Sequence, residues 1–171
     1  EEYTRLYTDY VRSTQVNLKP GDDATKLKGQ PLEKLVRYFL ERGGIARNVE
    51  EISDPKKWQV DGQGILHKKY IVLIWGEDIC RKMGFQLYME AKNHIDPMKG
   101  EEFALHYQRM IDHACNLGVV ASTSGYRIAD GKGIAERIHQ HSWRGTFHLL
   151  LSFYAFYEIL QDDKAPFEIL T

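Results

Sequence analysis

The spacing of hydrophobic residues changes repeatedly along this chain, and this change constrains the fold more than any other feature. Between Pro31 and Gly43 the apolar side chains follow the i, i+3, i+4, i+7 spacing of a helix with one buried face. These side chains are Leu32, Leu35, Val36, Phe39 and Leu40. Residues 85–92 instead alternate between apolar and polar positions, as a strand does. A chain that contains segments of both kinds is expected to form an α/β domain.

Further helices and strands are predicted from the same two patterns. Helices are expected at residues 3–11, 31–42, 100–116, 129–139 and 143–160, the last of which is apolar nearly all round. Strands are expected at residues 58–61, 67–75, 85–92 and 118–121, with a turn at Gly62 and Gly64 after the first. Residues 17–28 and 76–84 are predicted to be loops. The expected order is therefore helix, three strands, helix, strand, helix, helix.

Composition narrows the class of protein. The 171 residues, of which 43% are hydrophobic and 27% charged, suit one soluble globular domain. No apolar run is long enough to span a bilayer, and no signal peptide is recognisable, so a cytoplasmic protein without a membrane partner is expected. Cys80 and Cys115 lie far apart without metal-ligand spacing, which favours a reducing compartment. The net charge of −1 does not by itself mark a nucleic-acid-binding protein.

Glu90 and Lys92 are the strongest candidates for chemistry. They lie two residues apart on a predicted strand, so their side chains leave the same face about 7 Å apart along the chain. A carboxylate can hold a hard divalent cation while a lysine positions or activates water, as metal-assisted phosphodiester hydrolysis requires. One carboxylate holds Mg²⁺ poorly, so Asp61 is expected to supply a second and the carbonyl of Ala91 a further oxygen. A solvated ion pair on an exposed strand is the alternative interpretation.

Two short sequences carry a resemblance to a known family. Gln59-Val60-Asp61 and Tyr88-Met89-Glu90-Ala91-Lys92-Asn93 resemble the PD-(D/E)xK nuclease superfamily, whose members share a restriction endonuclease-like fold. Residues 28–33 and 118–126 resemble the leading helix and the fourth strand of that family. The resemblance implies a mixed sheet flanked by helices in the order αβββαβ, here with an extra C-terminal apolar helix. Residues 28–171 would form this single domain, and residues 1–27 an N-terminal helix and linker.

The resemblance also implies a reaction and a cofactor. It predicts a Mg²⁺-dependent endonuclease for double-stranded DNA, of restriction or defence type, with Mn²⁺ as a substitute cation. Asp61 and Glu90, with the carbonyl of Ala91, would hold the metal, and Lys92 would orient or deprotonate water. Glu33 would either act through a water molecule or pair with Arg37, one turn further along its helix. Asp78, which is closer to Glu90 in sequence, competes with Asp61 for the role of second carboxylate.

Contacts with DNA are expected beside this centre. The candidates are Lys68, Lys69, Asn93, Ser122 and Ser124, although the serines can equally cap the next helix. Gln108 and Arg109 are further candidates to face the site from the helix after the catalytic strand. A homodimer is expected, because two sites related by a two-fold axis can cut both strands. The alternatives are a nuclease for RNA, single-stranded or branched substrates, and a non-catalytic binding or assembly domain.

Overall fold

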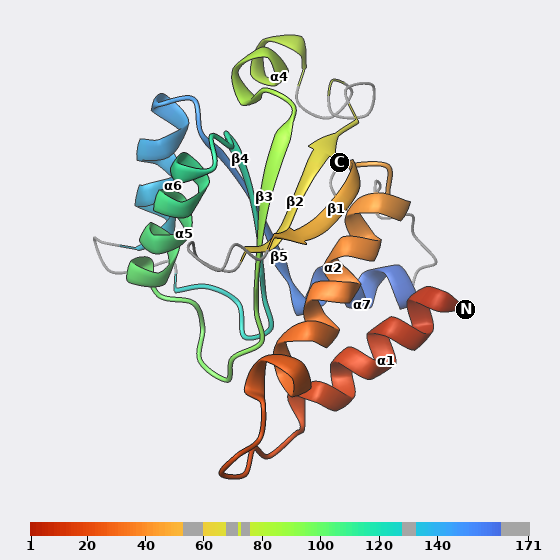
Figure 1. The fold of residues 1–171 in the computed structure, drawn as a ribbon. Coiled ribbons are helices and arrows are strands. Elements are labelled where there is room, and N and C mark those ends of the chain that lie inside the picture. The colour runs from red at the N-terminus through yellow and green to blue at the C-terminus, as the bar shows by residue number, and fades with distance from the viewer. Residues whose placement is uncertain (53–59, 68–71, 73–75, 128–132, 162–171) are drawn as a thin grey trace.

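The protein is built around one five-stranded mixed sheet, seen in a computed structural model that describes residues 1–52, 60–67, 72, 76–127 and 133–161 (Figure 1). The strands follow the order β1-β2-β3-β4-β5 across the sheet. They are β1 (Ala46–Ile52), β2 (Val60–Leu66), β3 (Gln86–Lys92), β4 (Leu117–Ser122) and β5 (Phe147–Ser152). Neighbouring strands from β1 to β3 are antiparallel, and those from β3 to β5 are parallel. The predicted α/β class is therefore confirmed.

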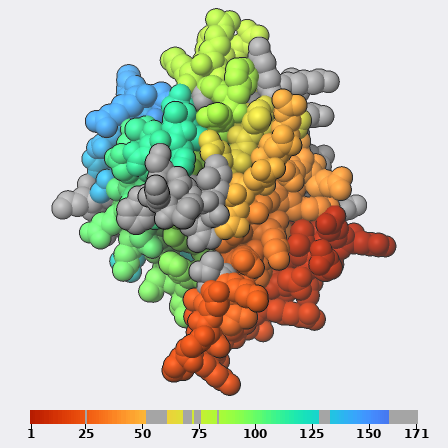
Figure 2. Space-filling view, viewed as in Figure 1, coloured from red at the N-terminus to blue at the C-terminus, as the bar shows by residue number. Residues whose placement is uncertain are grey.

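Helices cover both faces of the sheet. On one side lie α1 (Glu2–Thr14), α2 (Gln30–Arg42) and α7 (Phe153–Gln161), and on the other α5 (Gly100–Asp112) and α6 (Ile134–Trp143) (Figure 1). A short helix, α4 (Glu77–Met83), lies between β2 and β3 in the chain. A π-helical segment, η1 (Thr25–Gly29), runs directly into α2, and the chain between α1 and α2 projects from the lower end of the molecule (Figure 2). None of the helices in the described part of the chain is long and apolar enough to cross a membrane.

The alternation predicted for residues 85–92 decides which layer each side chain enters. Leu87, Met89 and Ala91 belong to the large core beneath α1 and α2, whereas Tyr88 packs with Met110 and Cys115 on the opposite face. Both faces of β3 are buried because it lies in the centre of the sheet. Cys80 and Cys115 are both buried.

The predicted N-terminal extension packs on the rest of the chain. Tyr10 of α1 is fully buried, and its hydroxyl donates a hydrogen bond of 3.0 Å to Thr123 Oγ1 beyond the end of β4. Tyr3 donates a hydrogen bond of 2.7 Å to the carbonyl of Phe156 in α7. Residues 1–14 therefore share the main core with α2 and α7.

Two predictions for residues 58–75 were wrong where the structure describes them. Gly62 and Gly64 do not form a turn but lie within β2, opposite Met89 and Leu87 of β3. A Cβ on Gly64 would overlap the side chain of Val49, so a close approach of β1 accounts for this glycine. Of the predicted strand 67–75, only residues 67 and 72 are described and neither is in a strand; residues 58 and 59 also lie outside the described part. The first strand is instead β1, which was not predicted.

Two further segments differ from expectation. Residues 76–84 were predicted to be a loop but contain α4, which begins after Gly76. Residues 143–160 were predicted to be one helix but divide into β5 and α7. Gly145, with φ at +78°, ends the helical stretch, and β5 then pairs with the open edge of β4. An apolar run does not distinguish a buried helix from a buried strand, because both are apolar on all sides. Of the predicted helix 129–139, residues 129–132 lie outside the described part of the chain, and α6 begins at Ile134.

Candidate metal-dependent active site

Strand pairing brings Asp61 and Glu90 together. Gly62 of β2 lies opposite Met89 of β3, so the next residue on each antiparallel strand is Asp61 on one and Glu90 on the other. Asp61 Oδ2 accepts a hydrogen bond of 2.7 Å from the backbone N–H of Ala91. The two carboxylates therefore leave adjacent strands of a rigid sheet, although α4 separates these strands in the sequence.

Glu90 is buried and has two cationic neighbours. Its carboxylate is 2.7 Å from Lys92 Nζ, measured to Oε1. Arg109 of α5 donates from one terminal nitrogen to both carboxylate oxygens, at 3.0 and 3.2 Å. The hydroxyl of Tyr88 donates to Oε2 at 3.2 Å. Since the side chain of Glu90 is only 4% exposed, these donors replace the water that would otherwise solvate it.

Glu33 lies in the first turn of α2 and is also buried. Arg37 is 3.7 Å from its carboxylate, so the predicted i, i+4 pair is present. The guanidinium is shared, however, since it donates two hydrogen bonds, of 2.6 and 3.2 Å, to the backbone carbonyl of Asp61 and lies 3.8 Å from Glu51. Arg37 therefore joins α2 to the start of β2, and the charges of Asp61 and Glu90 still act on Glu33.

The crowding of carboxylates changes their acidity. The pKa of Glu33 is raised to about 7, chiefly by burial and then by the charge of Asp61, while Arg37 opposes the rise. The pKa of Asp61 is likewise raised to about 6, chiefly by burial and then by the charge of Glu90, while the hydrogen bond from the N–H of Ala91 opposes the rise. Raised values of this kind mean that the ionised carboxylates would gain from another positive charge nearby. A pKa near neutrality also allows Glu33 to accept or release a proton at the pH of the cell.

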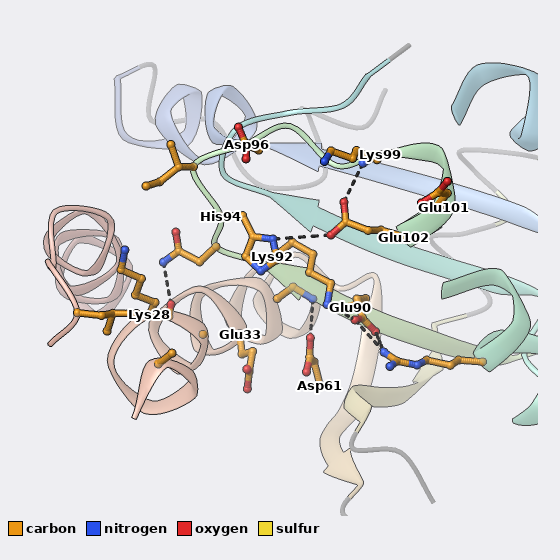
Figure 3. A pocket seen from close by; sticks show the side chains of 17 residues that line it. Lys28, Glu33, Asp61, Glu90, Lys92, His94, Asp96, Lys99, Glu101 and Glu102 are labelled. Atoms are coloured by element: carbon orange, nitrogen blue, oxygen red, sulfur yellow. Dashed lines mark hydrogen bonds and ion pairs between the residues drawn. The ribbon is translucent and has the colours of Figure 1, made fainter. Parts of the chain in front are cut away.

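These groups line one pocket, with a volume of about 840 Å³. Glu33, Asp61, Glu90 and Lys92 lie together at one end of it, and His94 and Glu102 lie further along (Figure 3). The pocket is bordered by η1, the start of α2, the chain that follows β3, and α5. Asp78, the competing carboxylate, is exposed in the first turn of α4 and is not among the described residues that line this pocket.

The residues predicted to contact DNA have different environments. Lys68 and Lys69 lie outside the described residues. Ser122 is buried and donates to the carbonyl of Gly125, while the half-buried Ser124 donates to the carbonyl of His94, so both serines stabilise the turn after β4. Neither serine forms the helix cap that was the alternative, because α6 begins with Gly133 at its N-cap.

Asn93 joins three separate parts of the fold. Its Nδ2 donates to Ser13 Oγ at 2.9 Å and to the carbonyl of Lys28 at 2.7 Å, and its Oδ1 accepts from Thr123 Oγ1 at 2.9 Å. These bonds connect α1, η1 and the end of β4 around one wall of the pocket. Asn93 therefore has a structural role that the sequence pattern did not indicate.

Asn93→Ala should lower the free energy of unfolding by about 3 kcal/mol, because it removes three hydrogen bonds worth about 1 kcal/mol each. Chemical denaturation of the purified protein would measure this loss. Ser124→Ala is the matched control: it removes one exposed hydrogen bond and should cost much less. An Asn93→Ala protein as stable as wild type would leave DNA contact as the better explanation of this side chain.

Arg109 is the residue whose importance the sequence understated. Gln108 and Arg109 were both candidates to face the site, and the structure separates them. Arg109 contacts Glu90, whereas Gln108 bonds to Asp112 on the exposed side of α5. The buried residues of α5 include His106 and Met110, and Arg109 lies beside that buried stripe. Its helical position, three residues after His106, was the available signal.

The chemistry of the donor set suits a hard cation. Asp61, Glu90 and Glu33 supply carboxylate oxygens, and oxygen is the ligand that Mg²⁺ and Mn²⁺ prefer. Among the described residues no three acidic, histidine or cysteine side chains are already arranged around a common point, so the carboxylates would have to turn toward a cation. Asp61 and Glu90 are the ligands best placed to do so. No protein-family model, curated protein or solved structure matches this chain.

Proposed function

We propose that this protein is a Mg²⁺-dependent nuclease that hydrolyses phosphodiester bonds in double-stranded DNA. The observation that carries the proposal is the meeting of Asp61 and Glu90 on paired strands, with Lys92 Nζ 2.7 Å from Glu90. These residues line a pocket that also contains Glu33. The order α2, β1, β2, β3, α5, β4, into which the short helix α4 is inserted between β2 and β3, supports the proposal. Apart from α4 it agrees with the αβββαβ order implied by the resemblance to PD-(D/E)xK nucleases.

The proposed roles follow from the position of each side chain. Asp61 and Glu90 would hold Mg²⁺, which when bound supplies positive charge for a phosphate oxygen. Lys92 forms an ion pair with Glu90 and would orient the attacking water or a phosphate oxygen. Glu33, whose pKa is raised to about 7 by burial, is suited to accept the proton of that water. The water oxygen bonds to phosphorus, the bond to the bridging oxygen breaks, and the leaving oxygen takes up a proton from solvent.

Supercoiled plasmid is the most direct substrate for a test. The purified protein should nick or linearise it with Mg²⁺ or Mn²⁺, and EDTA should abolish the reaction. Parallel reactions with single-stranded DNA and with RNA decide between the proposed substrate and the alternatives. If no nucleic acid is cleaved with either cation, the non-catalytic binding domain becomes the better interpretation.

Asp61→Asn should reduce metal-dependent cleavage by about 100-fold or more, since it removes a charged ligand of the cation and each such group contributes several kcal/mol to transition-state stabilisation. Asp78→Asn is the matched control and should retain near wild-type activity, because Asp78 lies on the exposed surface of α4. Gel assays of plasmid cleavage across a range of Mg²⁺ concentrations would compare the two. Loss of activity in Asp78→Asn alone would reverse the assignment of the second carboxylate.

A further inference from the structure

Glu90 contacts two positively charged side chains, Lys92 and Arg109. By the proposed function it also has to bind a divalent metal ion. We propose that Arg109 is a positioning residue that competes with the divalent cation for Glu90 and thereby weakens metal binding. This inference rests on the proposed function, because it concerns the cation that Asp61 and Glu90 would hold. It goes beyond that function, because no part of the Asp61, Glu90 and Lys92 pattern requires an arginine.

The contacts of Glu90 are the first support. Arg109 reaches both of its oxygens, at 3.0 and 3.2 Å, while Lys92 contacts Oε1 and Tyr88 contacts Oε2. Each oxygen of Glu90 therefore already accepts from two donors. A cation that binds Glu90 has to replace at least one of these donors, and Arg109 is the one that holds both oxygens.

Burial is the second support. The side chain of Arg109 is 17% exposed and that of Glu90 4%, so water and salt screen their interaction weakly. Burial lowers the pKa of Arg109, but Glu90 and Tyr88 together raise it by more, so the guanidinium remains charged. A fixed positive charge at this distance repels an incoming divalent cation much more strongly than a solvated surface charge would.

The third support is the anchoring of Arg109. α5 is held against the sheet by buried residues on either side of Arg109 in the sequence, among them His106 and Met110. Gly118 of β4 lies so close to these two side chains that a Cβ there would overlap both. The backbone of Arg109 therefore cannot easily move away from Glu90. Only a change in the conformation of the Arg109 side chain can free Glu90 to bind a cation.

Mn²⁺ binding without nucleic acid measures this competition directly. Arg109→Gln keeps a hydrogen-bond donor but removes the charge, so we expect it to bind Mn²⁺ about tenfold more tightly or better by titration calorimetry. Arg109→Lys keeps the charge and should bind Mn²⁺ about as wild type does. In cleavage assays Arg109→Gln should need less Mg²⁺ for half-maximal rate but reach a lower maximal rate, because Glu90 is then less firmly oriented.

The wild-type protein offers a test that does not depend on a variant folding. The side-chain N–H signals of Arg109, assigned by their absence from Arg109→Lys, should shift when Mg²⁺ is added, since Glu90 is their acceptor. Arg109→Gln that is folded yet binds Mn²⁺ no more tightly than wild type would overturn the inference, as would unchanged Arg109 signals in metal-saturated protein. If wild type cleaves DNA with Mg²⁺ while either result is found, the proposed function survives and only the role of Arg109 is lost. If wild type binds no divalent cation, both are overturned.

Discussion

Replacing Lys92 with alanine should reduce the maximal rate of Mg²⁺-dependent plasmid cleavage by about 100- to 1,000-fold, the loss that follows removal of one preorganised donor from a reacting centre. Lys92 Nζ lies 2.7 Å from Glu90 and lines the same pocket as Asp61, so no other lysine side chain that the structure describes is equivalent. Binding of Mn²⁺ should persist in Lys92→Ala, because the proposed ligands are oxygens and a repelling cation has been removed. Retained binding with lost cleavage would assign Lys92 to the chemical step.

Lys99→Ala is the matched control for this experiment. Lys99 lines the same pocket but is exposed, next to the start of α5. Its removal changes the charge of the pocket by the same amount and should reduce cleavage far less. Equal losses in the two variants would mean that the pocket needs positive charge in general, and that Lys92 has no special role. Thermal unfolding of Lys92→Ala should be recorded as well, since Glu90 is buried and loses one of its two cationic neighbours.

Acidification should destabilise the protein through three histidines behind the active site. His106 is almost fully buried, and neither of its ring nitrogens has a hydrogen-bond partner among the described residues. His141 and His148 contact each other through ring nitrogens 3.0 Å apart. Burial lowers the pKa of these histidines to about 3 for His106, 4 for His141 and 2 for His148. The positive charges of Arg109 and Lys92 contribute to the lowered pKa of His106.

The direction of the effect follows from these lowered pKa values. An unfolded chain protonates histidine near pH 6.5, whereas the folded protein keeps the three rings neutral. The free energy of unfolding is therefore highest above that pH and falls as the pH drops below it. Between about pH 7 and about pH 5 each buried histidine should cost about 2 kcal/mol of unfolding free energy. Glu33 and Asp61 act in the opposite direction, because their raised pKa values let the folded protein bind protons first. The total loss will therefore be smaller than the sum for the histidines.

His106→Leu separates the histidine contribution from that of the carboxylates. It removes a ring without hydrogen-bond partners in the described structure, so near pH 7 the variant should be about as stable as wild type. Near pH 5 it should be more stable by about 2 kcal/mol, since the carboxylates are the same in both proteins. Urea denaturation at both pH values measures the difference. His139→Leu, on the exposed face of α6, should not reduce the acid sensitivity in this way, and the same stability difference for His106→Leu at both pH values would contradict the prediction.

Local patterns in the sequence determined the helices and strands in which hydrophobic residues repeat with one clear spacing. α2 and β3 were predicted almost to the residue, because helical spacing and strict alternation have few alternative structures. The placement of Glu90 and Lys92 on one face of β3 followed from that alternation alone. The sequence did not determine whether residues 147–152 form a strand or a helix, because their apolar run has no clear period. Only pairing with the open edge of β4 selects a strand.

Only the tertiary structure decided what surrounds the two catalytic candidates. Asp61 became the neighbour of Glu90 through the pairing of β2 with β3. Local sequence patterns do not predict this pairing, because α4 lies between the two strands in the chain. Arg109 reached Glu90 because α5 packs back on the sheet. The raised pKa values of Glu33 and Asp61 arose from burial beside other carboxylates. Residue types and short spacings are properties of the chain, whereas distances between strands, burial and charge crowding exist only once distant segments have packed together.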